Sequence, residues 1–243
     1  MRKFILLGGT GFVGTEIAKQ LTSLGIAVAS ISRSGTMPRF LKPHTWAKEI
    51  EWVRADNQLQ ISELNNEADV LICLVGSPPL PTVSTAAYIR QLHQNSHPNI
   101  QAIQQAMGTD IKQLVVLGAH LPKVIDGDRF AYAKGKRLCL EAAEAFAESR
   151  QTRGSVVLQP TAIFGTRHTA NGMAINLGAT MKPFSKLQGL LPTRIQKFLP
   201  EQFVSVEAVA KMTVRAALDE TYAGKFSIIS NQEIANTTVS RSD

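Results

Sequence analysis

Tyr132 and Lys136 are the residues whose types and spacing are best suited to proton transfer, and they lie in a segment, 130–147, whose pattern predicts a helix. Side chains four positions apart share one helix face, about one turn apart. An ammonium close to a phenol favours the phenolate and lowers the phenol's pKa, so the pair could exchange a proton with a carbonyl or alcohol oxygen. The alternative is a half-buried tyrosine beside a solvated lysine.

The N-terminal segment, MRKFILLGGTGFVG, combines a short apolar run at 4–7, typical of a buried parallel strand, with a glycine-rich turn and a helical pattern over 12–24. Gly8 permits a tight turn, Gly11 lets the backbone approach a ligand, and Gly14 lets the helix pack closely on the strand. The helix N-terminus would then face an anion, which predicts a pyrophosphate-binding unit, although a turn that binds nothing is the alternative. The predicted contacts are Gly8, Thr10, Gly11, Phe12, Val13 and Gly14.

The segment 32–34, after the second predicted strand, occupies the position that selects between dinucleotide cofactors. An NAD site usually places Asp or Glu about twenty residues after the glycine turn, where it binds the ribose 2′-hydroxyl. This chain has Ser32, Arg33 and Ser34 there. Because a guanidinium can bind the 2′-phosphate of NADP in a forked geometry, we expect NADP(H) rather than NAD(H), with these three residues in contact. The alternative is that Arg33 is only an exposed loop residue.

Four more residues are predicted to border the dinucleotide: Asp56, Val75, Gly76 and Pro160. Asp56 follows the third predicted strand, at an expected edge of the adenine pocket, although it could equally cap the next helix. Gly76 would let a ribose or phosphate approach the end of the fourth strand. With the dinucleotide placed in this way, Tyr132 could pass a proton while the nicotinamide carries hydride, and Lys136 could hold the nicotinamide ribose.

The order of the remaining patterns predicts an α/β fold: a Rossmann-type doubly wound parallel sheet with a short C-terminal cap region. The cofactor should lie at the carboxyl ends of the strands. Residues 1–165 would form the NAD(P)-binding domain, and 166–243 a small cap region plus a final helix and strand that complete the same fold. The further strands are expected at 26–31, 50–53, 69–74, 113–117, 155–159 and 225–229, and the further helices at 86–107, broken in two by Pro98, and at 204–218.

The segment 166–202 differs from the rest, because prolines and basic residues alternate with apolar ones. We interpret it as a small cap over the substrate cleft. Its basic amphipathic part, 182–199, could instead rest on a membrane surface or a protein partner. The basic residues are Lys182, Lys186, Arg194 and Lys197.

The composition fits a globular protein with a substantial core: 243 residues, 44% of them hydrophobic, and a mean hydropathy of −0.01. Cys73 and Cys139 are too few for a disulfide framework and are expected to be buried thiols, and no metal-ligand spacing is present. Neither a secretory signal nor a run of membrane-spanning length is found, so we expect a cytoplasmic protein. The net charge of +7 suits anionic ligands. Nucleic-acid binding is not expected, because no basic stripe is interleaved with aromatic residues.

Three stretches, GGTGFVG, YAKGK and FVSVEAVAK, resemble the short-chain dehydrogenase/reductase superfamily, most closely its extended or atypical epimerase-like branch. The resemblance covers roughly residues 3–230. Within that branch the chain is similar to the dehydrogenase-like accessory subunit of respiratory complex I and to reductase-like factors linked to coenzyme Q synthesis. The resemblance implies an NAD(P)-binding Rossmann fold with Tyr132 and Lys136 in the active-site positions.

One departure from the family pattern follows the fifth predicted strand. Active members carry a serine or threonine there to hold the substrate oxygen, whereas this chain reads Leu117-Gly118-Ala119-His120. Two hypotheses therefore stay open. The chain is an NADP(H)-dependent oxidoreductase or epimerase-like enzyme acting on a small or lipophilic carbonyl or alcohol, with His120 as one conceivable replacement donor. Otherwise it is a non-catalytic NADP(H)-binding structural or sensor protein.

Overall fold

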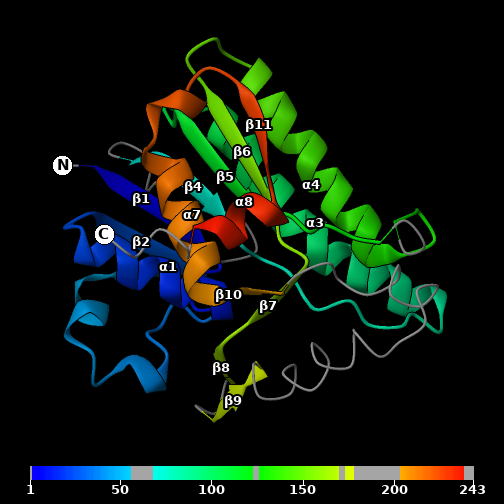
Figure 1. The fold of residues 1–243 in the computed structure, drawn as a ribbon, viewed down its shortest axis with the longest axis horizontal. Coiled ribbons are helices and arrows are strands. Elements are labelled where there is room, and N and C mark those ends of the chain that lie inside the picture. Colours follow the sequence, from blue (N-terminus) through cyan, green and yellow to red (C-terminus); the bar gives the residue numbers. More distant parts are fainter. Residues whose placement is uncertain (1, 56–67, 123–125, 170–172, 178–202, 238–243) are drawn as a thin grey trace.

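The fold is described by a computed structural model that covers residues 2–55, 68–122, 126–169, 173–177 and 203–237. Its centre is a sheet of seven strands in the order β11-β6-β5-β4-β1-β2-β3, and every strand pair in it is parallel (Figure 1). The predicted doubly wound sheet is thus confirmed. The strands are β1 (Lys3–Leu7), β2 (Ala27–Ser32), β3 (Glu51–Arg54), β4 (Ala68–Cys73), β5 (Gln113–Leu117), β6 (Gly154–Gln159) and β11 (Phe226–Ser230).

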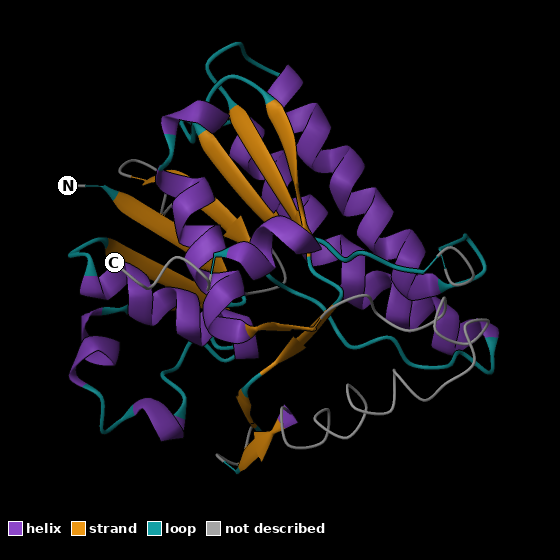
Figure 2. Cartoon of the chain, viewed as in Figure 1, coloured by secondary structure: helices purple, strands orange, loops and turns teal. Residues whose placement is uncertain are grey.

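Helices cover both faces of this sheet (Figure 2). On one face α1 (Phe12–Ser23) packs beside α7 (Val206–Leu218), and on the other α3 (Thr85–Met107) packs beside α4 (Ala131–Glu148). Alternate residues of β1 serve the two cores: Phe4 and Leu6 join the cluster under α1 and α7, whereas Ile5 and Leu7 join the one under α3 and α4. This burial on both faces explains why β1 is an unbroken apolar run.

The order in which strands are added to the sheet reverses between β1 and β4, and this switch point leaves two loops side by side at the carboxyl ends of these strands. From β1 the sheet is extended outward through β2 and β3, and it then continues on the other side of β1 with β4, β5, β6 and β11. Doubly wound sheets bind their ligands at this switch point. The glycine turn leaves β1 there, and the segment 74–81 leaves β4 beside it.

One helix prediction was wrong, and one helix was missed. Pro98 does not divide its helix, because α3 runs unbroken from Thr85 to Met107. Pro98 removes one backbone donor, and the carbonyl that loses it, on Gln94, belongs to an exposed residue and can bind water instead. A short helix after the last strand, α8 (Asn231–Asn236), was not predicted. It is started by a capping box in which Ser230 Oγ accepts from the backbone N–H of Glu233.

Smaller elements complete the described structure. The strand β7 (Ala162–Phe164) pairs with β10 (Phe203–Ser205), and β8 (Thr166–His168) pairs with β9 (Ala174–Asn176) in an antiparallel hairpin. Short 3-10 turns lie at η1 (Arg39–Leu41), η2 (Thr45–Glu49) and η4 (Glu220–Tyr222). The predicted basic segment 182–199 lies outside the described residues. Within the described part of the chain, no helix is long and apolar enough to cross a membrane.

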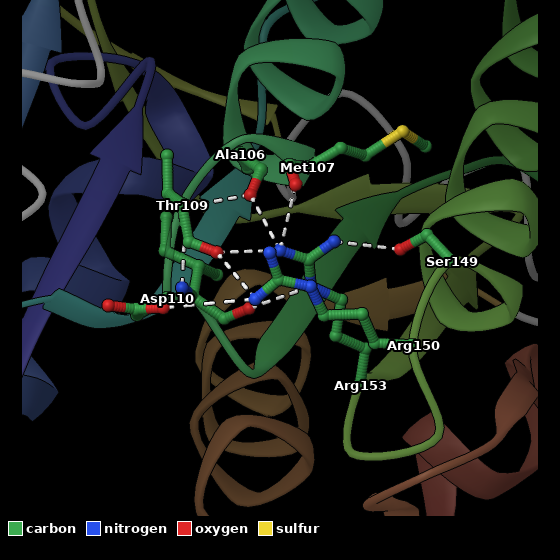
Figure 3. A network of polar contacts seen from close by, with 8 residues as sticks. Ala106, Met107, Thr109, Asp110, Ser149, Arg150 and Arg153 are labelled. Atoms are coloured by element: carbon green, nitrogen blue, oxygen red, sulfur yellow. Dashed lines mark hydrogen bonds and ion pairs between the residues drawn. The ribbon is translucent and has the colours of Figure 1, made fainter.

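A buried arginine fixes the end of α3 relative to α4 (Figure 3). The Arg153 guanidinium donates to the carbonyls of Ala106, Met107 and Thr109, at 3.3, 3.0 and 2.6 Å from Nη2, and its Nε donates to Ile111 O at 3.3 Å. Its Nη1 donates to Ser149 Oγ at 2.8 Å. Burial lowers the pKa of this guanidinium. The arginine replaces the missing helical donors at the C-terminus of α3 and thereby sets the position of the helix that faces Tyr132.

Candidate active site

The turn between β1 and α1 can be formed only with glycine at several positions. Gly8 has a φ of +93°, and its carbonyl accepts from the Gly11 N–H at 3.0 Å. A Cβ on Gly14 would collide with the carbonyl oxygen of Gly8 and the backbone of Gly9. The helix α1 then begins at Phe12 with no side-chain cap. Its first N–H groups therefore point out of the helix end, as a bound phosphate requires.

A cleft of about 490 Å³ joins this turn to the candidate catalytic pair. It passes the ends of β4, β5 and β6, which belong to distant parts of the sequence. Of the residues predicted to act in the site, it brings together Gly8, Gly11, Phe12, Val13, Gly14, Gly76, Tyr132, Lys136 and Pro160.

The other predicted contacts lie next to that cleft or outside the described residues. Thr10, Ser32, Arg33 and Ser34 line an adjoining cavity of about 780 Å³, which shares Gly11, Phe12 and Arg167 with the cleft. Val75 lies under the glycine turn, since a Cβ on Gly8 would be 3.2 Å from its Cγ2. Asp56 is outside the described part of the chain.

Lys136 is held between the ends of β4 and β5. Its Nζ donates to Leu117 O at 2.8 Å, and only 9% of the residue is exposed. A Cβ on Gly76 would make an ordinary contact with this nitrogen, at 3.4 Å, and a tight one with Asn95 Oδ1, at 3.0 Å. The nitrogen is 5.8 Å from the centroid of the Tyr132 ring. The pair therefore shares one helix face, but the ammonium's own hydrogen bond goes to a backbone carbonyl.

The expectation that Lys136 lowers the pKa of Tyr132 was wrong. Burial raises the Tyr132 pKa to about 12, and burial also lowers the pKa of Lys136, with the Cys139 thiol acting in the opposite direction. At 5.8 Å from the ring centroid the ammonium does not offset the loss of water around the phenol. At neutral pH Tyr132 is therefore a neutral proton donor.

Three amide side chains, one turn apart on α3, hold the segment that leaves β4, and the sequence analysis missed them. Gln91 Nε2 donates to Pro78 O at 3.1 Å, Asn95 Oδ1 accepts from the Ser77 N–H at 3.0 Å, and Asn99 Nδ2 donates to Val75 O at 2.8 Å. All three amides are buried. The sequence could have indicated them, because amide residues repeat every four positions and therefore share one helix face with the apolar residues that a buried helix face normally has.

The segment after β5, residues 117–120, carries no hydroxyl. Strand β6 lies close to its backbone at Gly118 and leaves no room there for a side chain. A Cβ on Gly118 would lie 2.9 Å from Leu158 O, so a side chain there would collide with β6. His120 lines a cavity of about 300 Å³ that adjoins the 490 Å³ cleft at Gly118, Ala119 and Lys136, but His120 is not among the residues of the cleft itself. Ser77 supplies a hydroxyl to the cleft instead. Its Oγ accepts from Asn95 Nδ2 at 2.9 Å, and its hydrogen can still be donated.

The 780 Å³ cavity is strongly cationic. Arg33, Arg39 and Arg167 line it, and none of its described lining residues is acidic. The loop that carries Arg33 is turned back at Gly35, which has a φ of +62° and donates to Ser32 Oγ at 3.2 Å.

The rings of two residues that line this cavity, Phe40 and His168, stack on each other with centroids 4.1 Å apart and planes 8° apart. Arg39 and Phe40 come from η1, and Arg167 and His168 from β8, so this side of the cavity is built from segments far apart in the sequence. The sequence analysis assigned no role to these four residues, and only the closeness of Arg39 to Arg33 could have indicated one.

The described residues contain no group of three or more histidine, cysteine or acidic side chains able to hold a metal ion. Cys73 and Cys139 are buried free thiols, as predicted, and burial raises both pKa values. The chemistry available in the cleft is therefore that of a neutral phenol, a buried ammonium, a guanidinium, the hydroxyls of Ser77 and Thr161, and a helix N-terminus suited to an anion.

Comparison with solved structures identifies the same fold in dinucleotide-dependent proteins. Gre2 of Candida albicans, in complex with NADPH, superposes with a TM-score of 0.67 at 16% identity, over 94% of this chain and 78% of that one. WbmF of Bordetella bronchiseptica, in complex with NAD⁺, superposes with a TM-score of 0.66 at 16% identity, over 100% and 80% of the two chains. At this identity the likeness shows the fold.

Sequence comparison extends the likeness to a plant protein. An uncharacterised chloroplast protein of Arabidopsis thaliana is 29% identical over 245 residues, which is 96% of this chain and 77% of the relative. A sequence model of the NAD dependent epimerase/dehydratase family matches residues 4–182, more than half of the chain. The epimerase-like resemblance noted from the glycine turn and the tyrosine helix is therefore confirmed, and the chain belongs to the NAD dependent epimerase/dehydratase family.

Proposed function

We propose that this protein is an NADP(H)-dependent oxidoreductase or epimerase-like enzyme acting on a small or lipophilic carbonyl or alcohol, with Tyr132 and Lys136 as its catalytic pair. One observation carries the proposal: a single cleft holds both the anion-binding end of α1 and the phenol of Tyr132. A nicotinamide dinucleotide fits these residues, because the glycines leave space where its diphosphate would approach the backbone. When bound, it would supply or accept the hydride.

The 780 Å³ cavity supports NADP(H) as the preferred cofactor. A 2′-phosphate carries charge that three guanidinium groups in one cavity can neutralise, and Arg33 occupies the position where an NAD site has a carboxylate. Structural neighbours crystallised with NADPH and with NAD⁺ show that this fold accommodates either dinucleotide. The preference proposed here therefore rests on the residues of the cavity.

In this proposal each residue has a separate task. The first N–H groups of α1 bind the diphosphate, and Arg33 binds the 2′-phosphate. Lys136, fixed by Leu117 O, lies where it can hold the nicotinamide ribose and lend positive charge to the cleft. Tyr132 donates its proton to the substrate oxygen. Because its pKa lies near 12, the protonated form predominates at neutral pH, which favours reduction of a carbonyl over oxidation of an alcohol.

The test is NADPH oxidation with a panel of aldehydes and ketones, followed by Tyr132→Phe. We expect the variant to lose at least 100-fold in kcat, since a positioned acid contributes on the order of 10²–10⁴-fold. It should still bind NADPH. Tyr222→Phe is the matched control, because Tyr222 lies in η4 and is not among the residues of the cleft. Full activity in Tyr132→Phe would remove this residue from the mechanism.

The alternative function, a non-catalytic NADP(H)-binding structural or sensor protein, is favoured by the absence of a hydroxyl in the segment 117–120. It predicts NADPH binding without turnover, and a protein or anionic-membrane partner that contacts residues 182–199. Charge reversal at Lys182, Lys186 and Lys197 tests the partner part of this alternative. If every association survives those changes, that part is wrong.

A further inference from the structure

A second cavity, of about 540 Å³, opens on the other side of Tyr132. Tyr132, Pro79 and Leu121 line both this cavity and the 490 Å³ cleft, so the phenol lies at the junction of the two. A molecule whose reacting oxygen accepts a hydrogen bond from Tyr132 could therefore extend into the second cavity while the dinucleotide occupies the first.

Hydrogen bonds to α3 hold both walls of this cavity in place. One wall is the segment 79–82, whose neighbour Pro78 accepts from Gln91 Nε2 at 3.1 Å. The other is the turn before α4, where Tyr88 donates its hydroxyl to Asp128 O at 2.5 Å. The Asp128 carboxylate in turn pairs with Arg137 of α4 at 2.7 Å. Because both walls are fixed to one helix, a ligand would bind with little further ordering of the protein.

The chemistry of the walls favours a hydrocarbon group. Leucine, proline, alanine and phenylalanine side chains make up most of the described lining. The polar lining residues are Thr82, Gln91, Arg129 and Tyr132, and the side-chain NH₂ of Gln91 already donates to Pro78 O. A sugar presents a hydroxyl on nearly every carbon, and each one buried without a partner is unfavourable. In contrast, Leu80 and Phe130 expose 62% and 40% of their surface, which an apolar ligand would cover.

We infer that the substrate is an apolar ketone or aldehyde whose hydrocarbon chain occupies the 540 Å³ cavity, and that Leu80 determines this specificity. The inference deepens the proposed function and rests on it for the reaction. In that reaction the carbonyl carbon gains a hydride from NADPH, which becomes NADP⁺, and the carbonyl oxygen gains the Tyr132 proton. The product is a secondary or primary alcohol, and solvent returns a proton to the phenolate.

The first experiment measures NADPH-dependent reduction of 2-butanone, 2-hexanone, 2-octanone and 2-decanone. We expect kcat/KM to rise about twofold to fourfold for each added methylene until the cavity is filled. Leu80→Asp should abolish most of this increase and lower kcat/KM for 2-decanone at least tenfold, with little change for 2-butanone. Val83→Asp is the matched control, because Val83 is 93% exposed on the same segment and is not among the lining residues.

The second experiment separates binding from turnover. Calorimetric titration of 2-decanone into the Tyr132→Phe variant with saturating NADP⁺ should show binding that Leu80→Asp weakens and Val83→Asp does not. Binding of this kind without reduction by the unaltered protein would refute the proposed oxidoreductase and keep the apolar site. Reduction without dependence on chain length, equal effects of the two aspartate variants, or no binding of 2-decanone at its solubility limit would refute the apolar site.

Discussion

The buried guanidinium of Arg153 allows a stability prediction whose magnitude can be worked from the structure. Replacing Arg153 with methionine keeps an unbranched side chain of similar reach and removes every donor. The carbonyls of Ala106 and Thr109 also accept from Thr109 Oγ1 and Arg150 Nη1, respectively. In the described structure, the carbonyls of Met107 and Ile111 accept from Arg153. The cost is therefore concentrated at two carbonyls, of which the one on Ile111 is buried and the one on Met107 is partly buried.

Each buried acceptor left without a donor costs about 1–3 kcal/mol. The two carbonyls together predict a loss of about 2–6 kcal/mol in the free energy of unfolding. The loss is smaller than its upper bound because methionine removes a buried charge, whose burial also lowers the Arg153 pKa. We therefore expect a decrease of about 2–4 kcal/mol in the free energy of unfolding. For a chain of this size, each kcal/mol shifts Tm by about 2–4 °C, so Tm should fall by about 4–16 °C.

The assay is urea unfolding followed by circular dichroism, with a thermal scan of the same samples. Arg150→Met is the matched control: its ion pair with Asp110 spans 3.8 Å between exposed side chains, so its removal should change Tm very little. Arg153→Lys should recover part of the loss, because an ammonium can reach some of the same carbonyls. A Tm for Arg153→Met equal to that of Arg150→Met would refute the reasoning that these carbonyls depend on one buried cation.

Three further predictions concern the cleft. Arg33→Ala should weaken NADPH binding about 10–100-fold and leave NADH binding unchanged, because only NADPH has a 2′-phosphate. Titration calorimetry measures both affinities, and Arg90→Ala, at an exposed residue, is the control. Equal losses of affinity for both dinucleotides would contradict the prediction. With the Tyr132 pKa near 12, this residue should cause no change in the rate of carbonyl reduction between pH 6 and 9, whereas the rate of alcohol oxidation should rise about tenfold per pH unit as the phenolate fraction grows. A reduction rate that falls between these pH values in the unaltered protein but not in Tyr132→Phe would refute the raised pKa. Gly14→Ala should abolish dinucleotide binding, because its Cβ would collide with Gly8 O; an unchanged NADPH affinity would show that the turn can shift at no cost.

In the candidate active site, Tyr132 is neutral, and Lys136 is hydrogen-bonded to the carbonyl of Leu117. The spacing of Tyr132 and Lys136 describes only their shared helix face. Their protonation depends on how deeply the rest of the molecule buries them and on the carbonyl of Leu117 in β5, a strand whose position the spacing of the two residues does not describe. The pair therefore has the residues expected of a phenolate-forming site and, in this structure, the electrostatics of a proton donor.

The sequence by itself determined the sheet and the glycine turn, because both depend on local patterns. Strand β5 was predicted with its observed bounds, 113–117, since a strand buried on both faces is a continuous apolar run. The predicted division into residues 1–165 and 166–243 stays a prediction, as do the roles of Tyr132 and Arg33. Pro98 misled the helix prediction because the lost hydrogen bond falls on the exposed side of α3, where water compensates for it.

Only the tertiary structure decided which residues meet around the cleft. The amides of Gln91, Asn95 and Asn99 bind the segment after β4 because the crossover places α3 beside it, and Arg167 joins Arg33 because β8 returns to the glycine turn. These contacts join positions far apart in the chain, whereas periodicity and turn chemistry describe neighbours only. The same limit applies to the Tyr132 pKa, because burial is a property of the packed molecule and cannot be read from the spacing of two residues.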